Sequence, residues 1–475
     1  MRKHSWKKSA GTVYQWAVGH PMLSVVLVWL VLFGFLYGVR QYVQHPLSGD
    51  EPHYLLMDYS LTHDHDLDLK NNYQNFDYFR YYPAPTPDHA SPLNTTQKFS
   101  GWYSFHGIGL PFMILPAFLW NERIGPMLVM LLVATIVLLL TWWWTLLLTK
   151  NAKVSLFSTL LLAISYFFNG LAGYLYPDFV TAGLLLGALI ILQRFYKDRL
   201  WQAVFAVLLV AMAFVHAKSL AFALPLGTLM LYKNYKQHKQ IPWPVLAVSV
   251  PAALVFFWLT HRWFGVWNPT AIYPTYLGMV SPFSSIPASL WDVRRGLLVY
   301  NPGFLLLLCG LPLWWKAHRA SLSTVAIILI PAYVITMSFS EWWGGYAPLG
   351  RYLMDFMPAL MPAVAFFLLA IRTTYQKAFV AVLTLATLMV TVFATRIRLS
   401  YPGYEPRAVF FSELEKRVGV GFDRLLPQYT LHTELVGRFS WLKTLAGMAL
   451  VAACVWYGWY VASKQSVPRK KVTTL

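Results

Sequence analysis

About twelve long apolar runs, separated by short polar segments, dominate this chain. A helix needs about 20 apolar residues to cross the hydrocarbon core of a bilayer, and most of the runs reach or approach that length. The chain is 57% apolar and 12% charged, a composition foreign to a soluble domain of this size. The sequence therefore predicts an all-α polytopic membrane protein with about 12 transmembrane helices. The runs cover 22–43, 125–148, 154–176, 179–196, 200–215, 219–232, 244–264, 302–315, 321–339, 353–371, 378–395 and 441–462.

Clusters of Lys and Arg between the runs orient them. The formal net charge of +19 is spread over short clusters that alternate consistently with both termini in the cytoplasm, which indicates topology signals and no nucleic-acid partner. The first run is too long for a cleaved signal peptide and is interpreted as a retained anchor. In this topology 107–120 is no full crossing but a juxtamembrane or re-entrant piece. The predicted division is a cytoplasmic N-terminus (1–21), a catalytic transmembrane module (22–264) with external loop 44–124, an external loop (265–301), a variable transmembrane module (302–462) with external loop 396–440, and a cytoplasmic tail (463–475).

The first external loop is unlike the rest of the chain. Residues 44–106 hold eight of the 19 acids and six of the 13 histidines, but only three of the 38 Lys and Arg. Asp50 and Glu51 stand directly after the first run, between Gly49 and Pro52, which favour a tight turn. A carboxylate at this place can act as a general base for a hydroxyl or help to hold a divalent metal.

Charges are missing from the middle of every predicted span. Ion-coupled transporters usually keep ionisable groups near the midplane of the bilayer, so this absence counts against a transporter. Arg294, Arg295 and Arg351 fall in external segments instead, where arginine forks suit the oxygens of an anionic headgroup. Residues 409–426 mix apolar and charged side chains as an amphipathic helix on the membrane surface does.

At this point the chain resembles the membrane-integral glycosyltransferases of the C fold, which include protein O-mannosyltransferase-like and aminoarabinose-transferase-like bacterial proteins. The resemblance extends over most of residues 20–395. Its motifs are the acidic pair Asp50-Glu51 after the first helix, Asp178 in Leu175-Tyr176-Pro177-Asp178, His106 where many members have lysine, Lys218 in the turn at 216–218, and the segments 291–302 and 342–352.

The resemblance implies an enzyme that takes a sugar from a polyprenyl-phosphate carrier and transfers it, with inversion, to an acceptor at the external face of a bacterial inner membrane. The acceptor would be a glycolipid such as that of lipopolysaccharide, a polysaccharide or a protein. Asp50 is the expected general base, and Glu51, Asp178 and His106 would orient it or bind a metal. The expected partners of the donor phosphate are Lys218, Arg294, Arg295 and Arg351.

Several alternatives remain open from the sequence. A divalent metal held by Asp50, Glu51 and His106 is one, and no other cofactor is expected. An O-antigen ligase or polymerase is a second, although such enzymes place their large external loop late in the chain. A flippase or transporter of a lipid-linked sugar is a third, and the absence of midplane charge speaks against it.

Overall fold

The structure is a computed structural model that describes residues 19–36, 47, 49–81, 95–96, 101–272, 280–345, 347–396, 409–419, 421, 426–427 and 438–464. Helices dominate these residues, which confirms the all-α prediction for the described part of the chain. One small hairpin pairs β1 (Thr95–Thr96) with β2 (Tyr103–Ser104) in antiparallel register. Most of the two predicted cytoplasmic ends and most of the loop 396–440 lie outside the described residues.

Among the described residues, five helical stretches are long and apolar enough to cross a membrane. They provide the spans of a multi-pass membrane protein, and their side chains that face outward include many exposed leucine, valine and tryptophan residues. The predicted count of about twelve spans is not confirmed. The five are α7 (Ile124–Thr149), α13 (Trp243–Phe264), α16 (Leu305–Met337) with the preceding η4 (Pro302–Phe304), α18 (Thr374–Arg396) and α20 (Arg438–Lys464).

Shorter helices occupy most of the other predicted runs. A helix rises about 1.5 Å per residue, so the shorter ones fall short of the full hydrocarbon thickness. They are α2 (Pro21–Leu36), α8 (Ala152–Ala163), α10 (Asp178–Arg194), α11 (Arg199–Val215), α12 (Leu220–His238) and α17 (Met357–Ala370).

The run 154–176 is not the single helix that the sequence predicted. Helix α8 ends at Ala163, and Ser165 begins the short helix α9 (Tyr166–Asn169) by accepting a hydrogen bond from the Phe168 N–H at 3.2 Å. Gly173 then takes a left-handed conformation with φ of 88°, which glycine adopts at little cost. Apolarity alone gave no sign of this break, which leaves a buried turn leading to α10.

Two other predicted runs, 302–315 and 321–339, correspond to two helices that meet at a kink within α16. His318 has non-helical φ and ψ angles inside α16. The Trp314 Nε1–H donates to Ser321 Oγ across this point at 2.9 Å. The polar segment that separated the runs in the sequence is therefore a kink.

The first external segment folds into short helices. They are α4 (Glu51–His63), α5 (Lys70–Gln74), η1 (Asp77–Arg80) and α6 (Gly109–Phe118). Helix α6 has 10 residues and spans about 15 Å, a length that agrees with the expectation that 107–120 makes no full crossing.

The amphipathic helix expected over 409–426 is present but shorter, as α19 (Val409–Val418). Its Phe410 and Phe411 rings pack against Tyr300, with ring centroids 5.2 and 6.2 Å away, and Phe410 also meets Phe393 at 5.2 Å. The described apolar side chains of this helix therefore cover the protein, which corrects the expectation that they face the membrane.

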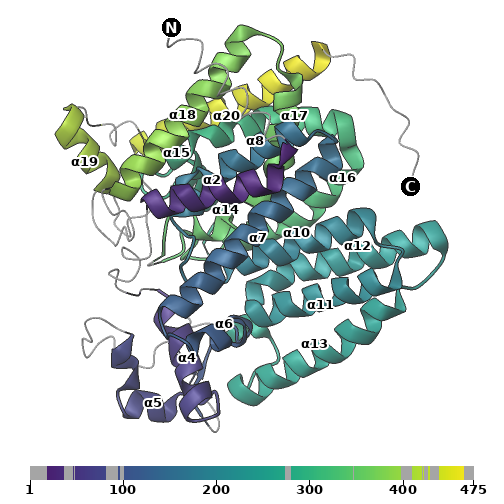
Figure 1. The fold of residues 1–475 in the computed structure, drawn as a ribbon, viewed down its shortest axis with the longest axis vertical. Helices are drawn as coiled ribbons and strands as arrows, with labels where there is room; N and C mark the ends of the chain where they lie inside the picture. Colours follow the sequence, from purple (N-terminus) through teal and green to yellow (C-terminus); the bar gives the residue numbers. More distant parts are fainter. Residues whose placement is uncertain are drawn as a thin grey trace.

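Helices α10 to α13 form one group, and α16, α17 and α20 form another, with α7 running between them (Figure 1). The first external helices α4 to α6 lie at the lower end of α7 in that view. The chain passes from the first group to the second through η3 (Pro269–Ile272), α14 (Pro282–Trp291) and α15 (Leu297–Tyr300). Within the groups, η2 (Ala217–Ser219) joins α11 to α12, and η5 (Arg351–Leu353) precedes α17.

Candidate active site

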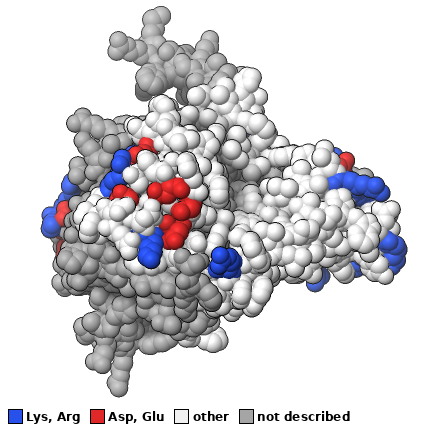
Figure 2. Space-filling view, turned by 90° about the horizontal axis from the view of Figure 1, so that it is seen from below, with Lys and Arg blue, Asp and Glu red and all other residues white. Residues whose placement is uncertain are grey.

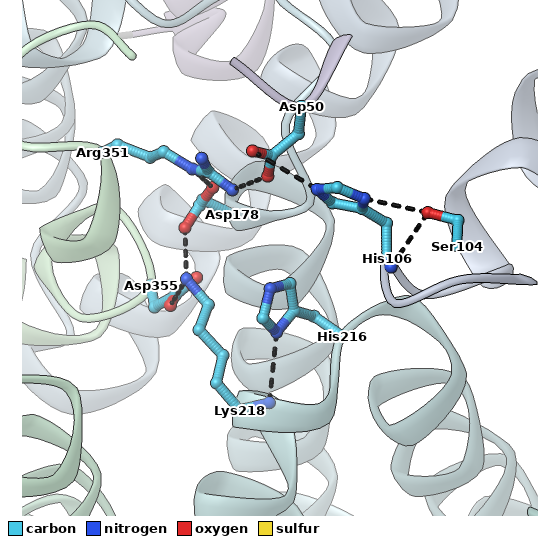
Figure 3. Close-up of polar contacts among 8 residues, drawn as sticks. All are labelled: Asp50, Ser104, His106, Asp178, His216, Lys218, Arg351 and Asp355. Atoms are coloured by element: carbon cyan, nitrogen blue, oxygen red, sulfur yellow. Dashed lines mark hydrogen bonds and ion pairs between the residues drawn. The ribbon is translucent and has the colours of Figure 1, made fainter. Parts of the chain in front are cut away.

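Turns from five separate parts of the chain meet around one cluster of charged side chains (Figure 3). They are the start of α4, the segment 103–107, the turn before α10, the turn between α11 and α12, and the segment 338–356. Asp50, His106, Asp178, Lys218 and Arg351, all expected at the site, come together here. They lie up to 301 positions apart along the chain.

Asp50 occupies the N-cap position of α4, but its carboxylate does not cap the helix. Gly49 precedes it with φ of 57°, a left-handed conformation that turns the chain sharply before the helix. The carboxylate points instead to Arg351 Nη2, with which it forms a hydrogen-bonded ion pair, and to His106 Nε2 at 3.6 Å. Asp50 is thus held by two groups from distant parts of the fold.

Arg351 bridges two acids. Its Nε–H donates to Asp178 Oδ2 at 3.0 Å while Nη2 donates to Asp50. The guanidinium lies over the ring of Tyr176 at 4.3 Å and near that of Tyr352 at 5.1 Å, contacts that favour a cation. Gly350, with φ of 71°, lets the backbone before Arg351 pack closely against Phe167, because a Cβ there would lie 2.7 Å from the Phe167 ring.

Lys218 forms the second cationic centre. His216 Nδ1 accepts the Lys218 backbone N–H at 3.1 Å and so fixes the turn. The ammonium group donates to Asp178 and lies 2.9 Å from Asp355 Oδ2. The result is a chain of alternating charges that runs from Asp50 through Arg351, Asp178 and Lys218 to Asp355.

His106 approaches Asp50 from the other side. Ser104 Oγ accepts the His106 backbone N–H at 3.2 Å and lies 3.0 Å from Nδ1. This contact allows either tautomer: a hydroxyl that donates to Nδ1 leaves the ring proton on Nε2, facing Asp50, and an Nδ1–H that donates to the hydroxyl leaves Nε2 free to accept. The His53 ring stacks on the imidazole at 4.9 Å. Gly107 allows the segment to pack against α11, since a Cβ there would lie 2.2 Å from the Val215 carbonyl oxygen.

Burial and charge act on these groups in opposite directions. Burial by itself raises the pKa of Asp50, but Arg351 and His106 reverse this and hold it well below its usual range. Burial raises the pKa of Asp355 to about 7, against the opposing effect of Lys218. Burial, with nearby positive charge, lowers the pKa of His53 and of His216 to about 3, so both rings stay neutral.

Glu51 was expected beside Asp50 in the site, and the structure places it differently. Its side chain is buried and Oε1 accepts the Leu175 backbone N–H at 3.1 Å. This bond ties α4 to the turn that carries Tyr176 and Asp178. Glu51 therefore helps to hold this turn in place.

Arg294 and Arg295 lie in a buried turn after α14, and no ion pair joins them to the described acids of the charged cluster. The backbone N–H groups of both bind Asp292 Oδ1, at 2.8 and 2.9 Å. The Arg295 guanidinium donates to the carbonyl oxygens of Ala347 and Gly345 at 3.2 and 3.4 Å. Arg295 thus braces the segment that presents Arg351, and contact of either arginine with a phosphate stays a prediction.

The remaining acids of the first external segment are not part of the cluster. Asp64 and Asp66 are exposed, and acidic side chains gather on one part of the face shown in Figure 2. Asp58 is buried in α4, where burial raises its pKa to about 9. Of this acid-rich segment, Asp50 alone among its described acids enters the charged network.

Sequence reasoning missed Asp355, Tyr176, Tyr352 and His216. Asp355 lies near the start of the predicted run 353–371, where a charged residue is common. The tyrosines and His216 are each direct or near neighbours of an expected residue, a signal that could have identified them.

The metal site considered for Asp50, Glu51 and His106 does not fit this arrangement. The Asp50 oxygens face Arg351 and His106, and the Glu51 carboxylate accepts a backbone N–H. No group of three or more His, Cys, Asp or Glu is placed to hold a metal among the described residues.

Comparison with known proteins identifies the fold. No protein-family model and no curated protein sequence matches the chain. The crystal structure of ArnT from Cupriavidus metallidurans in the apo state is similar, with a TM-score of 0.50, 17% identity, and coverage of 95% of this chain and 76% of that one. ArnT bound to undecaprenyl phosphate gives 0.48 and 15%, over 93% and 76%. An oligosaccharyltransferase from Archaeoglobus fulgidus gives 0.46 and 12%, over 86% and 58%.

The apo ArnT match extends over nearly the whole chain, which therefore shares the fold of that protein. The expected resemblance to the C-fold membrane glycosyltransferases is confirmed at the level of the fold.

Proposed function

We propose that this protein is a glycosyltransferase that moves a sugar from a polyprenyl-phosphate carrier to a cell-envelope acceptor. The reaction would take place at the external face of the membrane, with Asp50 as general base. The observation that carries this proposal is the position of Asp50, between the Arg351 guanidinium on one side and the His106 imidazole on the other. The shared fold with ArnT supports it.

The transfer step follows from this arrangement. The acceptor hydroxyl oxygen attacks the anomeric carbon, and its proton passes to Asp50. The bond from that carbon to the phosphate oxygen breaks, and its electron pair leaves with the polyprenyl phosphate. Fixed cations lower the energy of this leaving group as its charge grows, a role for Arg351 and Lys218.

Proton removal from the site then falls to His106. After transfer, Asp50 holds the proton, and His106 Nε2 lies 3.6 Å from its Oδ1. Nε2 accepts this proton when the ring carries its own proton on Nδ1 and donates it to Ser104 Oγ. The imidazolium then returns to the neutral form by releasing a proton to water. His53 and Tyr54 keep the ring in place by contacts at 4.9 and 5.4 Å between ring centroids.

An Asp50→Asn variant tests the proposal. Purified protein is given a panel of polyprenyl-phosphate sugars and a membrane extract as the source of acceptor. Loss of a general base reduces rates by roughly 100-fold or more, so transfer should fall by that amount.

Asp66→Asn is the matched control, because Asp66 is exposed and its Oδ1 accepts bonds that an amide oxygen also accepts. Equal transfer by wild type and Asp50→Asn would show that Asp50 is not the base. Movement of donor across acceptor-free liposomes, with no transfer, would favour a flippase.

A further inference from the structure

A groove lies beside the charged cluster, between α4, the segment 103–108, α11 and α13. Its cavity volume is about 60 Å³. Ser104 and His106 contribute polar groups to its wall, and His106 is the neighbour of Asp50. Most of its remaining wall is apolar, from Phe214, Phe256, Trp263 and Phe264 among others.

The shape of the groove depends on contacts between rings. Phe214 of α11 and Phe256 of α13 meet edge to face at 5.5 Å, and Trp263 stacks on Tyr103 at 5.5 Å. Helix α13 also carries exposed apolar side chains, including Leu254. The apolar wall therefore adjoins a surface that faces lipid, and a hydrocarbon chain is the ligand chemistry that suits it.

Two lipids could place a hydrocarbon chain in this groove: the donor and a lipid acceptor. The position of the groove relative to the cations favours one of them. In an inverting displacement, the nucleophile and the leaving group lie on opposite faces of the anomeric carbon. Arg351 and Lys218 lie on one side of Asp50, and His106 and Ser104 lie on the other (Figure 3). The donor phosphate belongs with the cations, so the groove opens on the side from which the acceptor hydroxyl must arrive.

We propose that this groove holds the acyl or alkyl chain of the acceptor, and that the acceptor is therefore a membrane glycolipid. The assignment rests on the proposed glycosyltransferase function. The head group then presents its hydroxyl to Asp50 beside His106. The donor's polyprenyl chain then extends from the site on the side of Arg351 and Lys218.

Ala213→Trp tests the assignment. Ala213 is a partly exposed residue of α11 that lines the groove, and an indole ring there takes up much of its space. Val207→Trp is the matched control, because Val207 is an exposed residue of the same helix and is not among the residues that line the groove. Transfer is measured with a membrane extract, and sugar is counted separately in the lipid-soluble and water-soluble products. Binding of undecaprenyl phosphate is measured alongside.

We expect wild type and Val207→Trp to place the sugar in the lipid-soluble product, and Ala213→Trp to do so at least about 10-fold less well, as a lost 1.4 kcal/mol of binding would produce. Binding of undecaprenyl phosphate should change less than about 2-fold. Sugar in the water-soluble product, equal transfer by all three proteins, or equally weakened undecaprenyl phosphate binding would overturn the assignment.

A second measurement separates this inference from the proposed function. A glycolipid with a diazirine in a C16 acyl chain is photolysed with the protein in nanodiscs, and the labelled peptides are identified by mass spectrometry. Label on 256–264, reduced by Ala213→Trp and displaced by unlabelled glycolipid but not by undecaprenyl phosphate, supports the groove even if no transfer is found. Absence of that label, or its displacement by undecaprenyl phosphate, overturns it.

Discussion

Replacing Asp355 by asparagine tests how burial acts on the charged cluster. Asp355 is buried, and its pKa is raised from 3.8 to about 7. An acid with a raised pKa binds its proton more tightly in the folded protein. Below pH 3.8, Asp355 is protonated in both the folded and the unfolded protein. Between pH 3.8 and about 7 only the unfolded protein releases this proton, so the folded protein loses stability as the pH rises. Each pKa unit corresponds to about 1.4 kcal/mol.

The difference of roughly 3 units between these pKa values corresponds to about 4 kcal/mol. Asparagine does not ionise, so the variant avoids this loss. We expect the stability of Asp355→Asn relative to wild type to rise with pH between about 4 and 7, by up to about 4 kcal/mol. His53 and His216 titrate with the opposite sign, because their lowered pKa values reduce stability as the pH falls. Both are present in the two proteins, so the difference isolates Asp355.

Thermal unfolding in detergent provides the assay. Cys309 and Cys454 are free and buried, so a thiol-reactive fluorescent dye reports their exposure as the protein unfolds. Melting midpoints are compared across pH 4–8, with Asp66→Asn as the control for a surface charge. A constant difference between Asp355→Asn and wild type at every pH would refute the reasoning.

Three further predictions concern residues that build the site or hold it in place. Arg351→Lys keeps the charge but cannot reach Asp50 and Asp178 together as the fork does; we expect kcat/KM to fall by about 100-fold and donor binding to weaken, measured by steady-state kinetics. Glu51→Gln keeps an oxygen for the Leu175 N–H and should stay within about 3-fold of wild-type activity, whereas Glu51→Ala should lose at least about 10-fold, as removal of a buried acceptor worth about 1–3 kcal/mol allows. Equal loss in both Glu51 variants would assign the carboxylate a direct chemical role. Gly107→Ala places a Cβ 2.2 Å from the Val215 oxygen and should lower the melting midpoint, and an unchanged midpoint would contradict the close packing.

Apolarity predicted helices well where a run also lacked turn-forming residues, as in α7. It failed at 154–176, because the serine and glycine that break the helix there stand within a run that is otherwise as apolar as its neighbours. It also failed for α19, since the same pattern of phenylalanines suits a membrane surface or a protein surface. Only the contacts of these phenylalanines in the folded protein distinguish a membrane surface from a protein surface.

The charged cluster was easier to predict from the sequence, because charges are rare at the ends of apolar runs. Asp50, Asp178, Lys218 and Arg351 all stood at such ends and all met. Asp355 also stood there, but nothing in the sequence showed that it would be buried against Lys218. Arg294 and Arg295 share the external position of Arg351, yet they are anchored in a separate turn by Asp292. Proximity to the site therefore depended on tertiary contacts that the sequence pattern does not contain.

On the proposed function, the charge balance of the cluster predicts how a donor phosphate would gain access to Arg351. Both described cations are already paired with acids, so an added anion gains little net attraction unless one carboxylate gives way. Asp178 and Asp355 have fully buried side chains, whereas that of Asp50 is 20% exposed, which makes Asp50 the partner that can move at least cost. Because Arg351 is the strongest of the nearby charges that lower its pKa, an Asp50 released by the donor is a stronger base than one in the empty site. On the proposed function, the acceptor would then be deprotonated only when a donor is bound.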